Sequence, residues 1–264
     1  MLLKISHTTR YHYDMPVPYA LQRLRLIPRD GGTQTVRTWS LSVEGAREQV
    51  RFLDQYGNET RLVSVEGEPE KTVIVASGEV ETRDTAGVVG PHRGFAPLWL
   101  YKAETPLTQA VERTRKLASE FDAAGGIEML HDLAGRIRDL VAYVVGSTDA
   151  STSAEQALEN GSGVCQDHTH VFLSVARQLG YPARYVSGYL MMDGSTEQAA
   201  SHAWAEAHVD NLGWVSFDAS NGISADERYV RIATGRDYRD AMPVSGIRIG
   251  AAKEQLAVHI TVEQ

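Results

Sequence analysis

The one cysteine of this 264-residue chain lies at the start of an apolar helical pattern. Cys165 follows the segment Gly161-Ser-Gly-Val. Beyond it, apolar side chains recur at the spacing of one helix face, at Phe172, Val175, Ala176 and Leu179. Gly180 ends this pattern, and Pro182 follows where a helix cannot continue. The pattern therefore predicts a helix with Cys165 in its first turn.

The position of Cys165 allows two interpretations. The first turn of a helix presents unpaired backbone N–H groups and the positive end of the helix dipole. This environment favours the thiolate, which is the nucleophilic form of cysteine. A free cysteine is also among the most buried residue types and packs as a small hydrophobe. Position alone leaves a reactive thiol and a core residue equally open, so other residues have to decide between them.

The composition excludes several classes of protein. The formal net charge of −8 argues against a nucleic-acid partner, because phosphate neutralisation needs a basic surface. Hydrophobic residues make up 42% of the chain and charged residues 23%, which predicts a packed globular core. One cysteine cannot form an internal disulfide, and the N-terminal stretch has no apolar segment typical of a secretion signal. No window reaches the roughly 18 uninterrupted apolar residues of a membrane span. We expect a cytoplasmic protein with no membrane partner.

Residues 1–90 show the alternation that is typical of short strands. Leu24 and Leu26 alternate with arginines, and residues 71–80 include the β-branched run Thr-Val-Ile-Val. Several such segments, with almost no helical periodicity, predict an N-terminal β-sandwich-like domain. Glycines and prolines then cluster over residues 91–105, which we interpret as a linker between two domains.

Residues 106–264 combine helical and strand patterns. Amphipathic helical periodicity covers residues 107–121 and 127–145. Ser153, followed three residues later by Gln156, is typical of a helix N-cap. Strand patterns follow at residues 183–190, 203–209, 214–218 and 256–262. The two halves of the chain together predict an α+β protein with a second domain over residues 106–264.

His202 and Asp218 lie at the open ends of a predicted β-hairpin. His202 begins the first strand, Asp218 ends the second, and residues 210–213 form the turn. Asp218 lies five residues beyond Gly213, whereas His202 lies eight before Asp210, so the two are not directly opposite. We expect a bulge or a register shift to bring them together. A carboxylate beside His202 would fix its tautomer and stabilise the imidazolium that forms when a thiol loses its proton.

Other histidines near the cysteine fit this chemistry less well. His168 shares the helix face of Cys165 but has no third group to orient its ring. His170 is turned away by more than a right angle, and the sequence offers no tetrahedral set, so no metal is expected. No acidic loop of the calcium-binding type is present either. His208 lies on the same strand face as His202 but next to the turn, and we predict that it is not catalytic.

Three separated motifs occur in a defined order. They are Gly163-Val-Cys165-Gln-Asp, Ser201-His202-Ala-Trp204-Ala-Glu206 and Gly213-Trp214-Val-Ser-Phe217-Asp218. In this order they resemble the bacterial transglutaminase-like family, whose members are described as cysteine proteases. The N-terminal strands with Tyr56-Gly57-Asn58 resemble the β-domain that precedes the core in this family. The segment Gly235-Arg236-Asp237-Tyr238-Arg-Asp240 resembles the family's C-terminal segment.

The resemblance implies a papain-like or transglutaminase-like core of helices packed on an antiparallel sheet, with a Cys-His-Asp triad. Cys165 would be the nucleophile, His202 the base and Asp218 the group that orients the base. The implied function is that of a cysteine amide hydrolase or acyltransferase, which acts on a peptide or protein amide through a thioester without a cofactor or metal. A non-catalytic binding module on the same scaffold is the alternative, because a fold does not guarantee activity. The oligomeric state is left open.

The resemblance does not identify the second hydrogen-bond donor to the oxyanion. The Cys165 backbone N–H would hold the oxyanion together with a second hydrogen-bond donor. Glu159 stands six residues before Cys165, where papain-type enzymes carry a glutamine, and its carboxylate would repel an oxyanion. Gln166 and Tyr189 are the remaining candidates.

Overall fold

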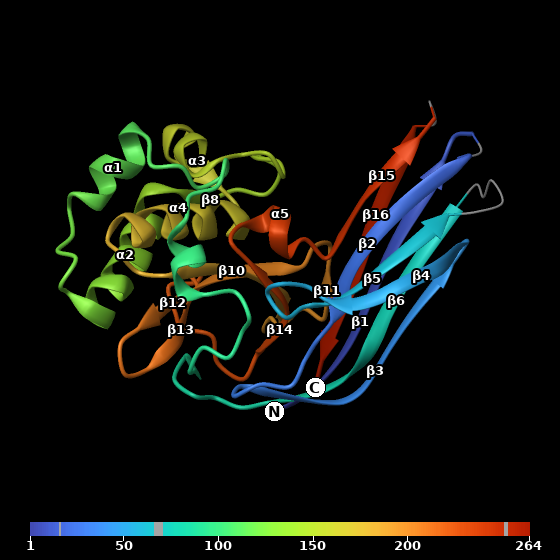
Figure 1. The fold of residues 1–264 in the computed structure, drawn as a ribbon, viewed down its shortest axis with the longest axis horizontal. Coiled ribbons are helices and arrows are strands. Elements are labelled where there is room, and N and C mark those ends of the chain that lie inside the picture. The colour runs from blue at the N-terminus through green and yellow to red at the C-terminus, as the bar shows by residue number, and fades with distance from the viewer. Residues whose placement is uncertain (16, 66–70, 251–252) are drawn as a thin grey trace.

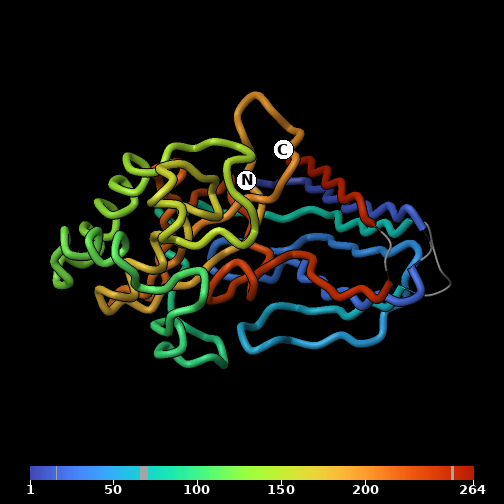
Figure 2. The backbone as a smooth tube through the Cα atoms, turned by 90° about the horizontal axis from the view of Figure 1, so that it is seen from above, coloured from blue at the N-terminus to red at the C-terminus, as the bar shows by residue number. Residues whose placement is uncertain are grey.

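The protein divides into a region of long strands and a region that holds the helices (Figure 1). The computed structural model of the chain describes residues 1–15, 17–65, 71–250 and 253–264. A view turned by 90° shows the same division and again places the two termini close together (Figure 2). Among the described residues, no helix has the length and apolar character needed to cross a membrane.

Two antiparallel sheets form the strand-rich region. The first has the strand order β11-β16-β1-β6-β3, and the second has the order β15-β2-β5-β4. Their strands are β1 (Leu2–Tyr13), β2 (Tyr19–Ile27), β3 (Gln34–Glu44), β4 (Ala46–Leu53), β5 (Glu59–Val65), β6 (Lys71–Thr82), β11 (Glu197–Gln198), β15 (Val244–Ile249) and β16 (Glu254–Glu263).

Alternating side chains of these strands form a core between the two sheets. In β1, Leu3 and Ile5 are buried while Leu2 and Lys4 face outward, because successive side chains point to opposite faces of a strand. The opposing sheet contributes Leu24, Leu26, Val63 and Val65 to the same cluster. The N-terminal region is therefore rich in sheet, as its strand patterns predict, and its two sheets share one core.

The last two strands of the chain complete these sheets. β16 pairs with β1 over its whole length, and β15 pairs with β2. The predicted domain over residues 106–264 is therefore wrong at its C-terminal end, because β15 (Val244–Ile249) and β16 (Glu254–Glu263) belong to the strand-rich region. Alternation of side chains identifies a strand, but its partner is set by pairing with residues far away in the chain.

A third antiparallel sheet carries the helices. Its order is β14-β10-β12-β13-β7, with β7 (Val88–Gly90), β10 (Ala183–Leu190), β12 (His202–Val209), β13 (Gly213–Phe217) and β14 (Tyr229–Gly235). The strand β7 comes from the end of the predicted N-terminal domain, residues 1–90, yet it pairs with β13. The stretch over 91–105, interpreted as a linker, contains the 3₁₀ helix η1 (Leu98–Lys102), whose Tyr101 packs on Trp214 of β13. This stretch is thus part of the packed structure around the third sheet.

Helix α4 lies at the centre of the helical region and packs against β12 and β10. Helices α1, α2 and α3 also contact it, so most of its side chains are buried. The remaining elements are α1 (Glu112–Ala118), α2 (Gly126–Leu140), β8 (Ala142–Tyr143), α3 (Ala154–Asn160), β9 (Ser162–Gly163), α4 (Cys165–Gln178) and α5 (Tyr238–Ala241). The helix predicted behind Cys165 is confirmed, whereas α2 ends before the predicted limit at residue 145.

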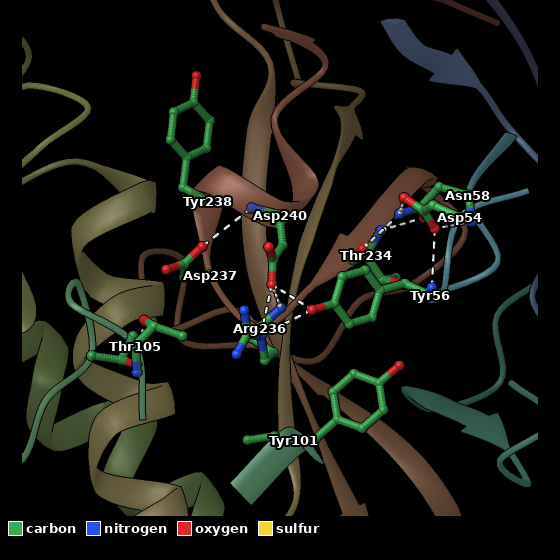
Figure 3. A network of polar contacts seen from close by, with 12 residues as sticks. Asp54, Tyr56, Asn58, Tyr101, Thr105, Thr234, Arg236, Asp237, Tyr238 and Asp240 are labelled. Atoms are coloured by element: carbon green, nitrogen blue, oxygen red, sulfur yellow. Dashed lines mark hydrogen bonds and ion pairs between the residues drawn. The ribbon is translucent and has the colours of Figure 1, made fainter. Parts of the chain in front are cut away.

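A buried polar network joins the turn after β4 to the third sheet (Figure 3). The Asn58 amide donates to Asp54 Oδ2 (3.0 Å) and to the Thr234 carbonyl (2.8 Å). Its Oδ1 accepts the Thr234 backbone N–H (2.8 Å). In the same turn, Tyr56 donates its hydroxyl hydrogen to Asp240 of α5 (2.6 Å). These bonds fix the strand-rich region against β14 and α5.

Replacing Asn58 by alanine should destabilise the protein by about 2–4 kcal/mol, because buried polar groups of Thr234 and Asp54 lose their partner. Urea denaturation of the variant and the wild type measures this difference. Ser40→Ala is the matched control, since Ser40 bonds to Ser77 on an exposed face and its loss should cost within about 0.5 kcal/mol. Equal unfolding free energies for the two variants would contradict the role given to Asn58.

Candidate active site

The backbone before α4 places Cys165 at the end of a short, glycine-dependent turn. α3 ends at Asn160, and its C-cap residue Gly161 has a positive φ of 63°, which suits glycine. Gly163 and the extended Val164 follow, and Cys165 is the first residue of α4. A Cβ at Gly163 would lie 2.7 Å from the Cβ of Asp167, so a larger residue would disturb the first turn. The two glycines of the motif therefore shape the approach to Cys165.

Asp167 stabilises the first turn of α4. Its Oδ2 accepts the Val164 backbone N–H (2.7 Å) and the Thr148 hydroxyl (2.6 Å). Burial raises the pKa of Asp167, and these hydrogen bonds oppose the shift. Cys165 lies in the same first turn, where backbone N–H groups have no intrahelical acceptor.

The structure brings His202 and Asp218 together across the β12–β13 hairpin. His202 Nε2 lies 2.6 Å from Asp218 Oδ2. The two strands pair without a bulge from Val209–Gly213 to Ala205–Phe217, so the expected bulge or register shift is wrong. Continuing this register places Asp218 opposite Trp204, two residues from His202. The side chains are diagonal neighbours, and such neighbours lie within reach of long or ring-bearing side chains.

Asp218 is a buried carboxylate that receives several hydrogen bonds. Besides His202, the Asn221 amide (2.7 Å) and the Tyr229 hydroxyl (2.8 Å) donate to Oδ2, and the Ser220 backbone N–H (3.0 Å) donates to Oδ1. Burial alone raises the pKa of Asp218, but the bonds and charge of His202 and the other donors outweigh it, so the pKa lies below its ordinary value. Asp218 is therefore held as an anion next to His202.

His202 is the link between this anion and the cysteine. Burial by itself lowers the pKa of His202, but the hydrogen bonds with Asp218 and with the Cys165 thiol outweigh it and raise the pKa to about 10. Asp218 occupies Nε2, which leaves Nδ1 as the ring nitrogen available to the sulfur. The structure thus groups the three residues Cys165, His202 and Asp218, and the contacts of His202 with the other two favour the protonated imidazole.

A cavity of about 610 Å³ opens beside His202. Its walls include the polar or aromatic side chains of Tyr143, Asn221 and Tyr229 and the apolar side chains of Leu190, Met192 and Ile223. Met192 and Ile223 are 42% and 38% exposed, so this apolar surface is open to a bound molecule. The cavity gives a substrate access to the side of the site on which His202 lies.

A second cavity, of about 580 Å³, lies at the junction with the strand-rich region. Four arginines line it, namely Arg29, Arg93, Arg184 and Arg231. Arg184 and Arg231 are already paired with the buried carboxylate of Glu206. Among the described residues that line this cavity, neither Cys165 nor His202 is found. The candidate active site is therefore at the first cavity.

The two histidines closest to Cys165 in sequence have structural contacts. His168 Nε2 lies 2.7 Å from the Val141 carbonyl, and Nδ1 lies 2.9 Å from the Val164 carbonyl. His170 Nε2 accepts the Tyr238 backbone N–H (3.2 Å), and burial lowers the pKa of His170 to about 3. Within the described part of the chain, no group of three or more His, Cys, Asp or Glu side chains is arranged to hold a metal ion.

The other residues considered from the sequence are held away from the sulfur. Gln166 donates to a backbone carbonyl of the preceding loop (3.3 Å). Tyr189 bonds to His7 (2.8 Å) and packs in the core of the strand-rich region. His208 lies edge-on against Trp214, with ring centres 5.5 Å apart. These contacts give none of the three a place beside Cys165.

Sequence reasoning did not single out Tyr143, Asn221 or Tyr229. Tyr143 lies in β8, within the stretch predicted as a helix, because the apolar helix pattern continues past the end of α2. The backbone leaves the helix when the Ala142 N–H donates to the Gly161 carbonyl (2.9 Å). The sequence Tyr-Val-Val at residues 143–145 favours a strand, and it could have indicated that the helix ends before Tyr143. Asn221 and Tyr229 reach Asp218 only through the tertiary fold.

The fold and the site together define an α+β protein with a thiol, an imidazole and a carboxylate grouped beside a cavity. Residues 115–219 match the family model of the Transglutaminase-like superfamily, and residues 3–81 match the Bacterial transglutaminase-like N-terminal region. The two matches confirm the transglutaminase-like family that the motifs of the sequence resemble.

Similar proteins match this chain along nearly its whole length. Uncharacterized proteins of Mycobacterium leprae (strain TN) and Mycobacterium tuberculosis (strain ATCC 25618 / H37Rv) are 28% and 29% identical to it. Each alignment covers 98% of this chain, together with 98% and 91% of the respective relative. The crystal structure of a "putative cysteine protease" from Cytophaga hutchinsonii superposes with a TM-score of 0.75 at 21% identity, and covers 100% of this chain and 90% of that one. This last likeness shows the fold.

The raised pKa of His202 predicts a loss of stability at alkaline pH. Its pKa is 6.5 ordinarily and about 10 in the folded protein. The stabilising contribution of the imidazolium is therefore complete below pH 6.5 and is lost as the pH rises through 10. The difference in unfolding free energy between wild type and His202→Gln should shrink over this range, as measured by urea denaturation under reducing conditions. A difference that stays constant would contradict a charged His202.

Proposed function

We propose that this protein is a cysteine amide hydrolase or acyltransferase that acts through a thioester at Cys165. The observation that carries the proposal is the single His202 ring, which bonds to Asp218 (2.6 Å) and to the Cys165 thiol. A protonated imidazole beside the sulfur favours the thiolate, the nucleophilic form. The buried Asp218 anion orients the ring and stabilises its charge.

Each of the three residues has one role in this reaction. The Cys165 sulfur attacks the amide carbonyl carbon and forms a C–S bond, while the π electrons of the carbonyl move to its oxygen. When this intermediate collapses, the C–N bond breaks and His202 gives its proton to the leaving amine. Water then attacks the thioester with neutral His202 as base, which releases the acid and restores the thiolate and the imidazolium. An amine in place of water gives transamidation.

A peptide or protein amide is the proposed substrate. The similar structure from Cytophaga hutchinsonii carries the name of a cysteine protease, which supports this class. The cavity of about 610 Å³ beside His202 has room for a side chain next to the reacting amide, and its apolar wall suits an apolar one. We propose hydrolysis as the outcome, since water is the default acceptor. A reducing compartment keeps a free thiol nucleophile in its active form, which supports a cytoplasmic site of action.

Cys165→Ala should abolish amide turnover and leave the protein folded, because the thiol is the nucleophile that attacks the amide in the proposed reaction. Release of a chromogenic amine from a peptide amide library measures turnover, and iodoacetamide labelling followed by mass spectrometry measures reactivity of the thiol. An active Cys165→Ala protein would refute the assignment. A wild-type thiol that resists alkylation would instead support a non-catalytic binding module on the same scaffold.

His202→Ala should lower the turnover rate by roughly 10⁴-fold or more, because triad members depend strongly on one another. Asp218→Asn should also lower the rate, since it replaces the anion that orients His202. His208→Ala is the matched control on the same strand, and its rate should remain close to that of the wild type. Ordinary rates for Asp218→Asn would move the orienting role to another residue.

The acceptor is identified by turnover of one amide substrate with and without an added primary amine such as glycine methyl ester. Hydrolysis predicts the free acid as the main product in both reactions. A product that carries the added amine in most of the turned-over substrate would assign transamidation instead. Mass spectrometry of the products separates the two outcomes.

A further inference from the structure

Tyr143 is fixed next to the cysteine by its backbone. β8 runs parallel to β9, with Tyr143 paired to Gly163. The N–H of the following residue, Val144, donates to the Gly163 carbonyl (2.8 Å). Because Gly163 precedes Cys165 by two residues, the strand that carries Tyr143 and the turn that carries the sulfur are parts of one hydrogen-bonded unit.

The ring of Tyr143 is fixed as well. It stacks on the His168 ring, with centres 6.1 Å apart and planes inclined by 9°. The His168 ring is itself held between the carbonyls of Val141 (2.7 Å) and Val164 (2.9 Å). Tyr143 is nevertheless 53% exposed, and it lines the cavity beside His202. The side chain is thus both held in place and open to a bound substrate.

The side chain of Tyr143 interacts with the thiol of Cys165. It forms a hydrogen bond with Cys165, and burial together with the charge and hydrogen bond of Cys165 raises the pKa of Tyr143 to about 12. The hydroxyl therefore keeps its proton throughout the neutral range and remains a donor. In the tetrahedral intermediate, the substrate oxygen lies only two bonds from this sulfur.

The other candidate donors are occupied or distant. Gln166 is bonded to the preceding loop, and Tyr189 is bonded to His7. Glu159, which stands where papain-type enzymes carry their donor, lies on the surface near Arg113 (3.9 Å). Tyr143 meets both conditions of an oxyanion donor, namely contact with the sulfur and a proton to give, and unlike His202 it has no acid–base role in the proposed reaction.

We propose that the Tyr143 hydroxyl and the Cys165 backbone N–H together bind the oxyanion of the acyl-transfer intermediate; this inference rests on the proposed function. When the C–S bond forms, the negative charge passes from the sulfur to the carbonyl oxygen. The Tyr143 hydrogen bond moves with it from sulfur to oxygen, without transfer of the proton. His202 keeps its separate role as acid and base on the other side of the sulfur.

The test compares two reactions of the same thiol in wild type and Tyr143→Phe. Acylation by p-nitrophenyl acetate passes through an oxyanion, whereas alkylation by iodoacetamide displaces iodide and forms none. Loss of one oxyanion donor should slow acylation by about 10²–10³-fold. Alkylation should stay within about threefold of wild type, which also shows that the variant is folded and that the thiolate is intact. Rates for Cys165→Ala are subtracted as the background.

Tyr238→Phe is the matched control. The charge of Cys165 contributes to the raised pKa of Tyr238, but no hydrogen bond between the two contributes to it. Both of its rates should equal those of the wild type. An unchanged or faster acylation in Tyr143→Phe would overturn the proposal, and so would equal losses in acylation and alkylation, which would mean that Tyr143 acts on the thiol. A wild type that alkylates but is not acylated would overturn the proposed function and, with it, this role of Tyr143.

Discussion

The pairing of β1 with β6 on one edge and β16 on the other is the constraint on which the rest of the structure depends. It places the first and last strands of the chain side by side in one sheet. The helices and most of the third sheet are therefore formed by the segment of the chain between β6 and β15, so the chain leaves the strand-rich region and later returns to it. The buried bonds of Asn58 with Thr234 then fix how the two regions face each other.

The candidate site is built on helices and strands that pack in the core of the helical region. Cys165 begins α4, His202 begins β12, and Asp218 follows the end of β13. α4 packs directly on β12, so the separation of thiol and imidazole is set by core packing instead of by a loop. The hydrogen bond with the buried Asp218 opposes the effect of burial on His202 and contributes to its raised pKa.

The sequence was most informative where local pattern and local structure coincide. The helix behind Cys165 and the strand over 183–190 lie where periodicity predicts them, and the motifs led to the correct family. The grouping of His202 with Asp218 followed from the hairpin, although through a diagonal contact in a regular ladder. What depends on distant pairing could not be predicted: the sheets that β15 and β16 join, and the pairing of β8 with β9 that places Tyr143 beside Gly163.

The neighbouring termini have a consequence for how this chain tolerates rearrangement. Lys4 pairs with Glu263 in the β1–β16 ladder, and their side chains form an ion pair of 3.4 Å. A short linker can therefore join the two ends without disturbing either sheet, which allows circular permutation at an exposed loop. For the same reason, the fold can be inserted as a unit into a surface loop of a host protein, because its first and last strands are neighbours, as the two strands of a hairpin are.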